Sequence, residues 1–440
     1  MPSLSPSEPV LVWSAALLLA ALVILPYAWR FRRRLRRDRE RKEEAVALGI
    51  DRPAAQYPYV DPRHCIGCGA CVRACPEGDV LGIVGGTAVV VNGLRCVGHA
   101  RCEEACPVGA ITVGLGDLKS REDVPLLDET QQTTVPGLYI VGELGGLSLV
   151  RNAVFQGRKI VEHIAETVRV EPAGEGALDV VIAGAGPAGL SAGLTAQAAG
   201  LSYAVLEREE SLGGSLLHYP RRKMVLTQPV ELPPWGALTR EEYAKETLLE
   251  LFEGMVRDHV LNVRFGDAVE DVQRENGTFL VHSARGTTWR ARTVVLALGR
   301  RGTPRKLGIP GEELPKVMYR LVDAEGYQGQ KILVVGGGDS AAEAALGLSR
   351  QPGNEVVLSY RREKLVRLKK KNQEALDCFL AEGRIRPLFS SQPLEIEPGR
   401  VRLKVGGETV ELANDYVFVF AGGVPPFDLL KKIGVRFGGG

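Results

Sequence analysis

The sequence has few cysteines, and almost all of them lie in one short region. Seven of the eight fall between Cys65 and Cys106, and only Cys378 lies outside that interval. The residues after Cys106 therefore lack a C-x-x-C pair, which argues against enzymes that depend on such a redox dithiol. Cys378 lies in an apolar, helix-like stretch, where a cysteine is most simply interpreted as a packing residue.

The chain also has little net charge. Its formal charge is +2, yet residues 30–42 carry eight Arg and one Lys against only Asp38 and Glu40. The rest of the chain is therefore mildly acidic. The basic character is local, so no nucleic-acid partner is predicted.

Charged residues are absent from residues 10–29, a run of twenty mostly apolar residues. As a helix this run would span about 30 Å, the thickness of the hydrocarbon core of a bilayer. A cleavable signal peptide carries its positive charges before the apolar stretch, whereas here only Glu8 precedes it and the arginines follow. The run thus predicts a retained anchor, with a buried hydrophobic helix as the alternative.

The positive-inside bias sets the expected topology. It puts the N-terminus outside the cell and everything from Arg30 onward in the cytoplasm. We therefore expect a single-pass protein of the cell membrane, with residues 1–30 as transmembrane anchor and residues 31–56 as a basic juxtamembrane linker.

The clustered cysteines indicate metal ligation, because disulfides are rare in a reducing compartment. The stretch CIGCGACVRACP has the C-x2-C-x2-C-x3-C-P spacing of bacterial-type ferredoxins, and a zinc ribbon is the weaker alternative. By this resemblance one [4Fe-4S] cluster is bound by Cys65, Cys68, Cys71 and Cys106. A ferredoxin-like α+β domain is predicted over residues 57–116.

A second cysteine run, CVGHARCEEACP, has His99 where the second cysteine is expected. The same resemblance gives a second site the ligands Cys75, Cys96 and Cys102. Three interpretations of His99 stay open. It ligates the fourth iron, it leaves a three-iron cluster, or it is a solvated turn residue beside an empty site.

Two glycine-rich fingerprints follow apolar strands and predict two Rossmann-like domains. In the first, LDVVIAGAGPAG, the glycines allow the turn, the approach of a pyrophosphate and close packing of the next helix. A carboxylate at the end of the next strand is placed to bind a ribose hydroxyl, and LGG follows it. The predicted FAD contacts are Gly184, Gly186, Gly189, Glu207, Gly213 and Gly214.

The second fingerprint, KILVVGGGDSAAEAA, supplies Gly336, Gly338 and Ala341. The strand that follows it ends without a carboxylate and is followed by Arg361 and Arg362. An arginine pair can hold a 2′-phosphate, so NADPH is preferred over NADH. The alternative is a solvated basic turn that continues into the lysine-rich residues nearby.

Between and after the fingerprints lie TVVLALGRRGTPRKLGIPGEE and DYVFVFAGGVPPFDLL. With these segments the chain resembles thioredoxin-reductase-like flavoproteins, particularly their bacillithiol-disulfide-reductase-like and ferredoxin-NADP-reductase-like branches, over about residues 118–440. The resemblance implies an α/β fold with two Rossmann-like domains. We expect the FAD domain over residues 171–300, the NADPH domain over 301–415, and a return segment over 416–440.

One family segment is out of order. In the family the chain returns to the FAD domain through T-x-V-P-G followed by apolar residues and an acidic residue, and here TTVPGLYIVGE lies before the first fingerprint. The resemblance implies a circular permutation in which residues 117–170 close the FAD domain. Gly142 and Glu143 would then contact FAD, and the helix beginning near Arg151 would direct its positive end toward the flavin.

These parts together predict a redox enzyme. A hydride carries two electrons and an iron-sulfur cluster takes one, and a flavin handles both. We expect a membrane-anchored NAD(P)H-dependent oxidoreductase that moves electrons between NADPH, FAD and 4Fe-4S clusters, to or from a ferredoxin-like protein, a quinone or a membrane redox partner. Such chemistry requires no catalytic acid or base, so the catalytic residues stay unknown, and a homodimer is left open.

Two other functions compete with this one. Some relatives without the cysteine pair reduce low-molecular-weight disulfides, so a bacillithiol- or thioredoxin-type reductase is the first alternative. The second is a non-catalytic membrane redox sensor, against which two intact nucleotide fingerprints argue.

Overall fold

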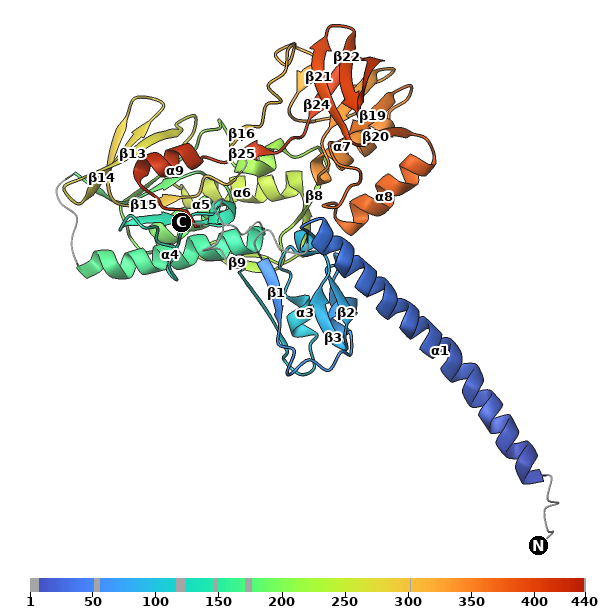
Figure 1. The fold of residues 1–440 in the computed structure, drawn as a ribbon. Coiled ribbons are helices and arrows are strands. Elements are labelled where there is room, and N and C mark those ends of the chain that lie inside the picture. Colours follow the sequence, from blue (N-terminus) through green and yellow to red (C-terminus); the bar gives the residue numbers. More distant parts are fainter. Residues whose placement is uncertain are drawn as a thin grey trace. The chain divides into compact units, whose positions relative to one another are not determined.

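The structure is a computed structural model that describes residues 8–50, 56–115, 124–145, 149–170, 176–300 and 302–438. The chain divides into two compact units, Met1–Gly114 and Leu115–Gly440. Figure 1 shows the course of the chain through both units.

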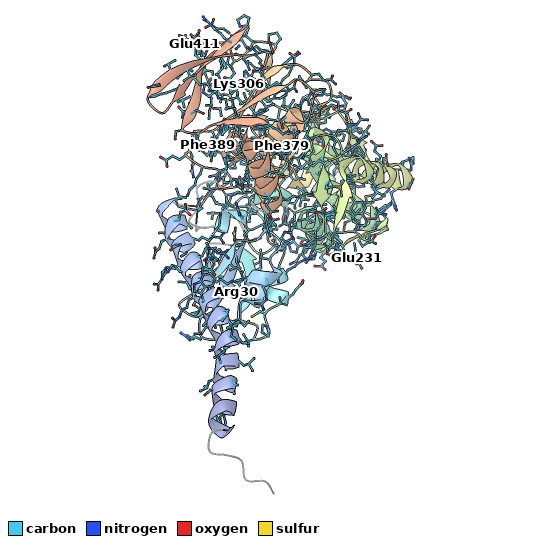
Figure 2. The ribbon with its side chains drawn as sticks, turned by 90° about the vertical axis from the view of Figure 1, so that its right-hand side faces the viewer. Arg30, Glu231, Lys306, Phe379, Phe389 and Glu411 are labelled. Carbon is cyan, nitrogen blue, oxygen red and sulfur yellow. The ribbon has the colours of Figure 1, made fainter. Side chains whose placement is uncertain are left out.

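The first unit begins with one long helix, α1 (Glu8–Ala47), which contains both the apolar run and the basic run. Residues 27–47 have no Gly or Pro and are rich in Arg, Glu and Ala, which favour a helix, so the basic residues expected in a linker continue the helix instead. Arg30, labelled in Figure 2, marks the start of the basic part. By length and composition α1 can cross a membrane, a test that a signal sequence also passes.

The rest of this unit is a small domain of short strands and helices. Its elements are β1 (Gln56–Val60), α2 (Ala70–Ala74), β2 (Leu81–Val84), β3 (Thr87–Val90), η1 (Gly93–Arg95), α3 (Arg101–Glu104) and β4 (Ile111–Leu115). Strand β1 pairs with β4, and β2 pairs with β3 as an antiparallel hairpin. Gly85 and Gly86, both with positive φ, form the two-residue turn that such a hairpin favours.

The second unit contains a seven-stranded sheet in the order β12-β7-β6-β15-β14-β13, with β5 also paired to β15. The strands are β5 (Leu138–Ile140), β6 (Leu178–Ala183), β7 (Tyr203–Leu206), β12 (Val263–Arg264), β13 (Val269–Glu275), β14 (Thr278–Ser283) and β15 (Thr288–Leu296). The strands β5, β15, β6, β7 and β12 are parallel neighbours, as in a dinucleotide-binding sheet.

Helices and short strands complete this domain. They are η3 (Gly142–Gly145), α4 (Val150–Val170), α5 (Pro187–Ala198), η4 (Gly214–His218), β8 (Met224–Leu226), β9 (Val230–Leu232), β10 (Gly236–Leu238), β11 (Glu242–Ala244) and α6 (Lys245–His259). Apolar side chains of α4, α5 and α6 form one buried core with β6 and β15.

A second parallel sheet has the order β17-β24-β18-β19-β20. It consists of β17 (Val317–Met318), β18 (Lys331–Val335), β19 (Glu355–Ser359), β20 (Ile385–Leu388) and β24 (Tyr416–Val419), with α7 (Asp339–Ser349) and α8 (Lys370–Ala381) packed on it. A meander of β21 (Ser391–Glu397), β22 (Arg400–Val405) and β23 (Glu408–Ala413) packs on the sheet. The chain passes between the domain with the first sheet and the domain with the second sheet twice. The two connecting segments contain β16 (Thr303–Pro304) and β25 (Gly423–Val424), which pair with each other.

The C-terminal residues return to the first sheet. Helix α9 (Phe427–Ile433) and Val435 enter the core that contains Leu138 of β5. The amide of Leu126 donates to the carbonyl of Arg436 at 2.9 Å, and that of Gly438 donates to Val124 at 3.2 Å.

These contacts confirm the prediction that the C-terminal end lies beside the start of the transposed segment. The part of that prediction that falls on residues 118–123 lies outside the described residues. The C-terminal residues and the segment that contains β5 therefore belong to the same domain core, as a circular permutation requires.

Candidate functional site

The seven clustered cysteines line two separate cavities in the small domain. The first is lined by the sequence-predicted group Cys65, Cys68, Cys71 and Cys106, and the second by Cys75, Cys96, Cys102 and His99. The fold explains this grouping. Helix α2 ends directly before Cys75, which lines the second cavity, and helix α3 ends near Cys106, which lines the first. The structure thus gathers the cysteines as the ferredoxin resemblance implies.

The chemistry of these thiols fits a cationic cluster. Burial, together with the neighbouring Cys75 and Cys96, raises the pKa of Cys102 to about 11. Burial also raises the pKa of Cys71, again with other cysteines adding to the effect. Several thiolates in one small cavity repel one another, so they need positively charged iron to be held together.

Backbone amides already point at some of the sulfur atoms. The amide of Ala88 donates to Sγ of Cys65 at 3.3 Å, and that of Ala110 donates to Sγ of Cys106 at 3.2 Å. Hydrogen bonds to cluster sulfurs are one means by which proteins tune iron-sulfur potentials. The first cavity therefore fits a [4Fe-4S] cluster in its ligands and in its hydrogen bonding.

His99 faces the second cavity, and its side chain is only 10% exposed. Its Nε2 lies 3.3 Å from Oε1 of Glu77, a residue that the sequence did not single out. A side chain so enclosed is not solvated, which argues against that part of the third interpretation. Whether the second site holds a cluster ligated by His99, a three-iron cluster or none stays a prediction.

The first glycine fingerprint forms a tight turn between β6 and α5. Gly184 has φ +106, and a Cβ at Gly189 would lie 1.8 Å from the carbonyl oxygen of Gly184. Only glycine fits such a contact. Gly186 caps α5, and nothing lies within 4 Å of its Cβ position, which leaves room beside the helix N-terminus for a phosphate.

Glu207, at the end of β7, is 4% exposed and accepts two backbone amides. Ala185 donates to its Oε2 at 2.6 Å, and Glu209 donates to its Oε1 at 2.9 Å. The predicted ribose ligand thus also braces the glycine turn. Gly213 and Gly214 have positive φ, and the Cβ position of Gly214 lies 3.4 Å from Cα of Gly186.

The transposed segment reaches the same place. Gly142, with φ +76, donates its amide to Oε1 of Gln156 at 2.8 Å, and its Cβ position lies 3.3 Å from Cβ of Ala188 on α5. Glu143 follows in η3. Helix α4 is joined to α5 by Ser191, whose hydroxyl donates to the carbonyl of Val154 at 2.7 Å. Gly142 therefore lies at the start of the fingerprint helix, where FAD is expected.

The second fingerprint forms the same turn between β18 and α7. Gly336 has φ +148, and its Cβ position lies 3.0 Å from Cβ of Ala341, which is buried. Gly338 caps α7, with nothing within 4 Å of its Cβ position. The middle glycine, Gly337, lies against the ring of Tyr360. Alanine therefore serves as the third small residue of this motif.

Arg361 and Arg362 follow Tyr360 immediately after β19. Arg361 is exposed and Arg362 is half-buried. Within the described part of the chain neither guanidinium has an ionic or hydrogen-bonding partner. The pair is therefore free to hold an anionic group near the second turn, as expected for a 2′-phosphate.

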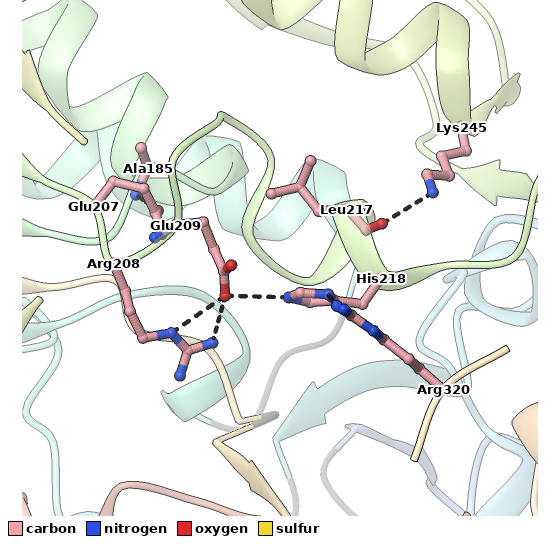
Figure 3. Close-up of polar contacts among 8 residues, drawn as sticks. All are labelled: Ala185, Glu207, Arg208, Glu209, Leu217, His218, Lys245 and Arg320. Carbon is pink, nitrogen blue, oxygen red and sulfur yellow. Dashed lines mark hydrogen bonds and ion pairs between the residues drawn. The ribbon is translucent and has the colours of Figure 1, made fainter. Parts of the chain in front are cut away.

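Sequence reasoning missed a polar chain near the first turn, drawn in Figure 3. Glu209 is paired with Arg208 at 2.9 Å and lies 3.3 Å from Nε2 of His218, whose Nδ1 lies 3.3 Å from Arg320. Lys245 donates to the carbonyls of Leu217 and Tyr219. The contact between His218 and Arg320 joins residues that are far apart in the sequence, and no motif marks this group.

Comparisons with known proteins agree with this geometry. Residues 57–107 match the 4Fe-4S dicluster domain. A ferredoxin-NADP reductase of Ignicoccus hospitalis is 29% identical over 270 residues, which are 59% of this chain and 82% of that protein. A ferredoxin-NADP reductase of Thermus thermophilus is 30% identical over 58% of this chain and 76% of that protein.

The bacilliredoxin reductase Bdr of Bacillus subtilis is 26% identical over 58% of this chain and 80% of that protein. The solved bacillithiol disulfide reductase Bdr from Bacillus cereus aligns with a TM-score of 0.55 and 26% identity, over 59% of this chain and 82% of that one. The chain is thus an NAD(P)H-dependent flavin oxidoreductase with a thioredoxin-reductase-like fold, and its cofactors are FAD, NADPH and a 4Fe-4S cluster.

Residues 181–438 match the pyridine nucleotide-disulphide oxidoreductase family. This match covers more than half of the chain and includes both nucleotide fingerprints. The chain therefore belongs to the pyridine nucleotide-disulphide oxidoreductase family.

Proposed function

We propose that this protein is a membrane-anchored oxidoreductase that moves electrons between NADPH, FAD and two iron-sulfur clusters, to or from a redox partner at the membrane. Flavin, when bound, can exchange a hydride with a nicotinamide and exchange the same two electrons singly with other centres. In this proposal the residues of the two glycine turns and of the two cysteine-lined cavities bind and orient the cofactors.

One observation carries the proposal. The cysteine-rich domain ends with β4 at Leu115, and the next strand, β5, begins at Leu138 in the sheet that contains the first glycine turn. In chain order the cysteine-rich domain thus comes directly before the segment that we propose completes the FAD domain. A tether of this length keeps the two domains at high effective concentration, which favours electron transfer between their centres.

We further propose the individual roles of the site residues. Gly184, Gly186 and Gly142 would admit FAD to the N-terminus of α5, and Arg361 with Arg362 would hold the 2′-phosphate of NADPH. His99 would ligate the second cluster, supported by its place beside the three cysteines of that cavity. Imidazole in place of a thiolate raises the reduction potential of a cluster.

A second candidate function is the reduction of a low-molecular-weight disulfide, which the similarity to Bdr proteins favours. Cys378 gives this reading little support. Its Sγ donates to Oε1 of Glu382 at 3.1 Å, and the hydrogen bond to that carboxylate raises the pKa of the exposed thiol. A thiol whose pKa is raised is a poor nucleophile at neutral pH.

The two functions are separated by two variants, Cys68→Ser and Cys378→Ser. For electron transfer through the clusters, Cys68→Ser should abolish most NADPH-dependent reduction of a quinone, while Cys378→Ser leaves it unchanged. If the protein is a disulfide reductase, wild type should instead turn over bacillithiol disulfide with NADPH, and Cys68→Ser should not affect that rate. Flavin absorbance of each variant controls for loss of FAD.

A further inference from the structure

Helix α1 is fixed to the cysteine-rich domain by its C-terminal third. Asp38 is 4% exposed, and its Oδ2 accepts the amide of Ile83 in β2 at 3.0 Å. One turn later Arg41 is paired with Asp79 at 2.5 Å, and one turn earlier Leu35 packs on the domain core. The helix and the domain therefore form one body, and the orientation of one determines that of the other.

The order of these contacts fixes which end of the domain faces the apolar run. Asp38 of α1 contacts Ile83 in β2, whereas Arg41, farther along α1, contacts Asp79, which precedes β2. The helix α1 and the strand β2 therefore run in opposite directions. The hairpin turn at Gly85 and Gly86 therefore points toward the apolar part of α1. In Figure 1 the helix continues well past this hairpin.

The first cluster cavity lies at this same end. A Cβ at Gly67, between Cys65 and Cys68, would lie 2.2 Å from the carbonyl oxygen of Gly86, so the first cysteine loop packs against the hairpin turn. The second cavity is lined by Glu77 and Val80, next to Asp79 at the opposite end.

Helix geometry gives the height of this end above the apolar run. Asp38 lies eight residues beyond Arg30, about 12 Å along the helix axis. The hairpin turn lies about two strand residues, roughly 7 Å, back toward Arg30. The hairpin end is thus about 5 Å above the level of Arg30, comparable with the thickness of roughly 5 to 8 Å of the headgroup layer on each side of a bilayer.

The surface around the first cavity suits that position. Ile66 is 64% exposed, Val108 is 42% exposed, and Cys68 between them is exposed as well. Arg63 and Arg73 are exposed nearby. Apolar side chains ringed by cations are the composition expected of a surface that rests on anionic headgroups.

Asp61, an exposed carboxylate of the same loop, lies with its Oδ2 2.7 Å from Nδ1 of His64. The two exposed arginines Arg63 and Arg73 outnumber it. Glu77 and Asp79 belong to the opposite end of the domain. The exposed arginines of α1 add further positive charge at the same level.

We propose that the end of the cysteine-rich domain that holds the first cluster cavity, with Ile66 and Val108 at its tip, rests on the bilayer surface. There the protein delivers electrons to a lipid-soluble quinone. This inference rests on the proposed anchor and electron-transfer function, and it names the partner. In the net reaction NADPH, a proton and quinone give NADP⁺ and quinol. Because only electrons leave the protein, singly at the first cluster, the quinol takes both of its protons from water. The hydrogen of the hydride is released to water as a proton, which leaves the net uptake of one proton given above.

A spacer in α1 tests the inference without touching the cluster. Seven alanine-rich residues inserted between Arg32 and Arg33 lift the domain by about 10 Å and turn it by only about 20°. The control carries the same seven residues between Glu8 and Pro9, on the other side of the apolar run. Both full-length proteins are reconstituted in vesicles of anionic lipid that contain a long-chain quinone.

Two readouts are compared. One is quinone reduction by NADPH. The other is the spin relaxation of the reduced first cluster in vesicles whose headgroups carry chelated gadolinium. Gadolinium speeds up this relaxation, and the enhancement falls steeply with the distance between the cluster and the headgroups. The measurement needs no turnover. We expect the spacer in α1 to lose the enhanced relaxation and to lower quinone reduction by an order of magnitude or more. NADPH-driven bleaching of the flavin should stay unchanged, and the control should behave as wild type.

If the spacer variant kept both the relaxation and the rate, the inference would be wrong although the anchor was intact. Release of the wild-type protein from vesicles by alkaline washing would instead overturn the anchor, and the inference with it. A second pair of variants gives an independent check. Ile66→Glu with Val108→Glu should lower quinone reduction, whereas Val260→Glu, at a still more exposed apolar position outside the domain, should not.

Discussion

Replacement of Gly157 by alanine tests the packing that the permutation requires. Gly157 lies in the middle of α4, and a Cβ there would lie 2.2 Å from the carbonyl oxygen of Ala188, near the start of α5. Because the contact is with backbone, no side chain can turn away to relieve it. Such overpacking costs about 1 to 3 kcal/mol, partly offset by about 0.5 to 1 kcal/mol of better helix propensity.

The matched control is Gly254→Ala in α6, where the nearest atom to the Cβ position is the end of the Arg257 side chain at 3.7 Å. This variant should gain the helix propensity alone. The two variants should therefore differ by about 1 to 3 kcal/mol, or about 2 to 10 °C in Tm for a domain of this size.

Thermal unfolding of the FAD-loaded protein, followed by circular dichroism and by release of flavin fluorescence, measures this difference. We also expect Gly157→Ala to lose FAD more readily, because Ala188 belongs to the helix that faces the pyrophosphate. Equal stabilisation by both exchanges would show that α4 does not cross α5 closely. The transposed segment would then not complete the FAD domain.

Three further predictions concern charges. Arg361→Ala with Arg362→Ala should raise the KM for NADPH about ten- to a hundredfold and leave that for NADH nearly unchanged, since each charge-assisted phosphate contact is worth about 1.5 to 3 kcal/mol; equal effects on both would contradict the assignment. The hydrogen bond from Lys432 lowers the pKa of Asp271 below 3.8. Lys432→Ala should therefore reduce the free energy of unfolding slightly above pH 4, and this loss should disappear as the pH falls through the lowered pKa, as denaturant titrations at several pH values would show. Asp38→Ala leaves a buried amide of β2 unpaired and should cost about 1 to 3 kcal/mol, seen as earlier loss of the visible cluster absorbance on heating; unchanged cluster loss would refute the contact.

Local motifs were sufficient to predict the two glycine turns, and the family resemblance implied that the closing segment comes first in the chain. The turn at Gly184 depends on a few consecutive residues, since only glycine tolerates its contacts. The closing segment around Gly142 was recognised in the same way, and the contacts of Leu126 with Arg436 confirm the joined ends. The resemblance to bacterial-type ferredoxins likewise implied which sulfurs share a cavity.

Contacts between distant residues could not be predicted. Asp38 looked like one charge in a basic linker, and only the packing of α1 on β2 shows it as a buried acceptor. Glu207 was predicted to bind a ribose, yet its carboxylate also holds two amides of its own turn region. The approach of Glu77 to His99 depends on how the two cysteine loops fold together. Each case needs the tertiary structure, which no spacing encodes.

The central claim is that electrons from NADPH reach the clusters of the same chain. An anaerobic titration of the full-length protein with NADPH, followed at once by absorbance and by electron paramagnetic resonance, tests it most directly. The account predicts that flavin bleaching is accompanied by the signals of reduced iron-sulfur clusters, and that Cys68→Ser removes the first cluster signal while the flavin still bleaches. Complete bleaching of the flavin in the wild-type protein without any cluster signal would contradict it.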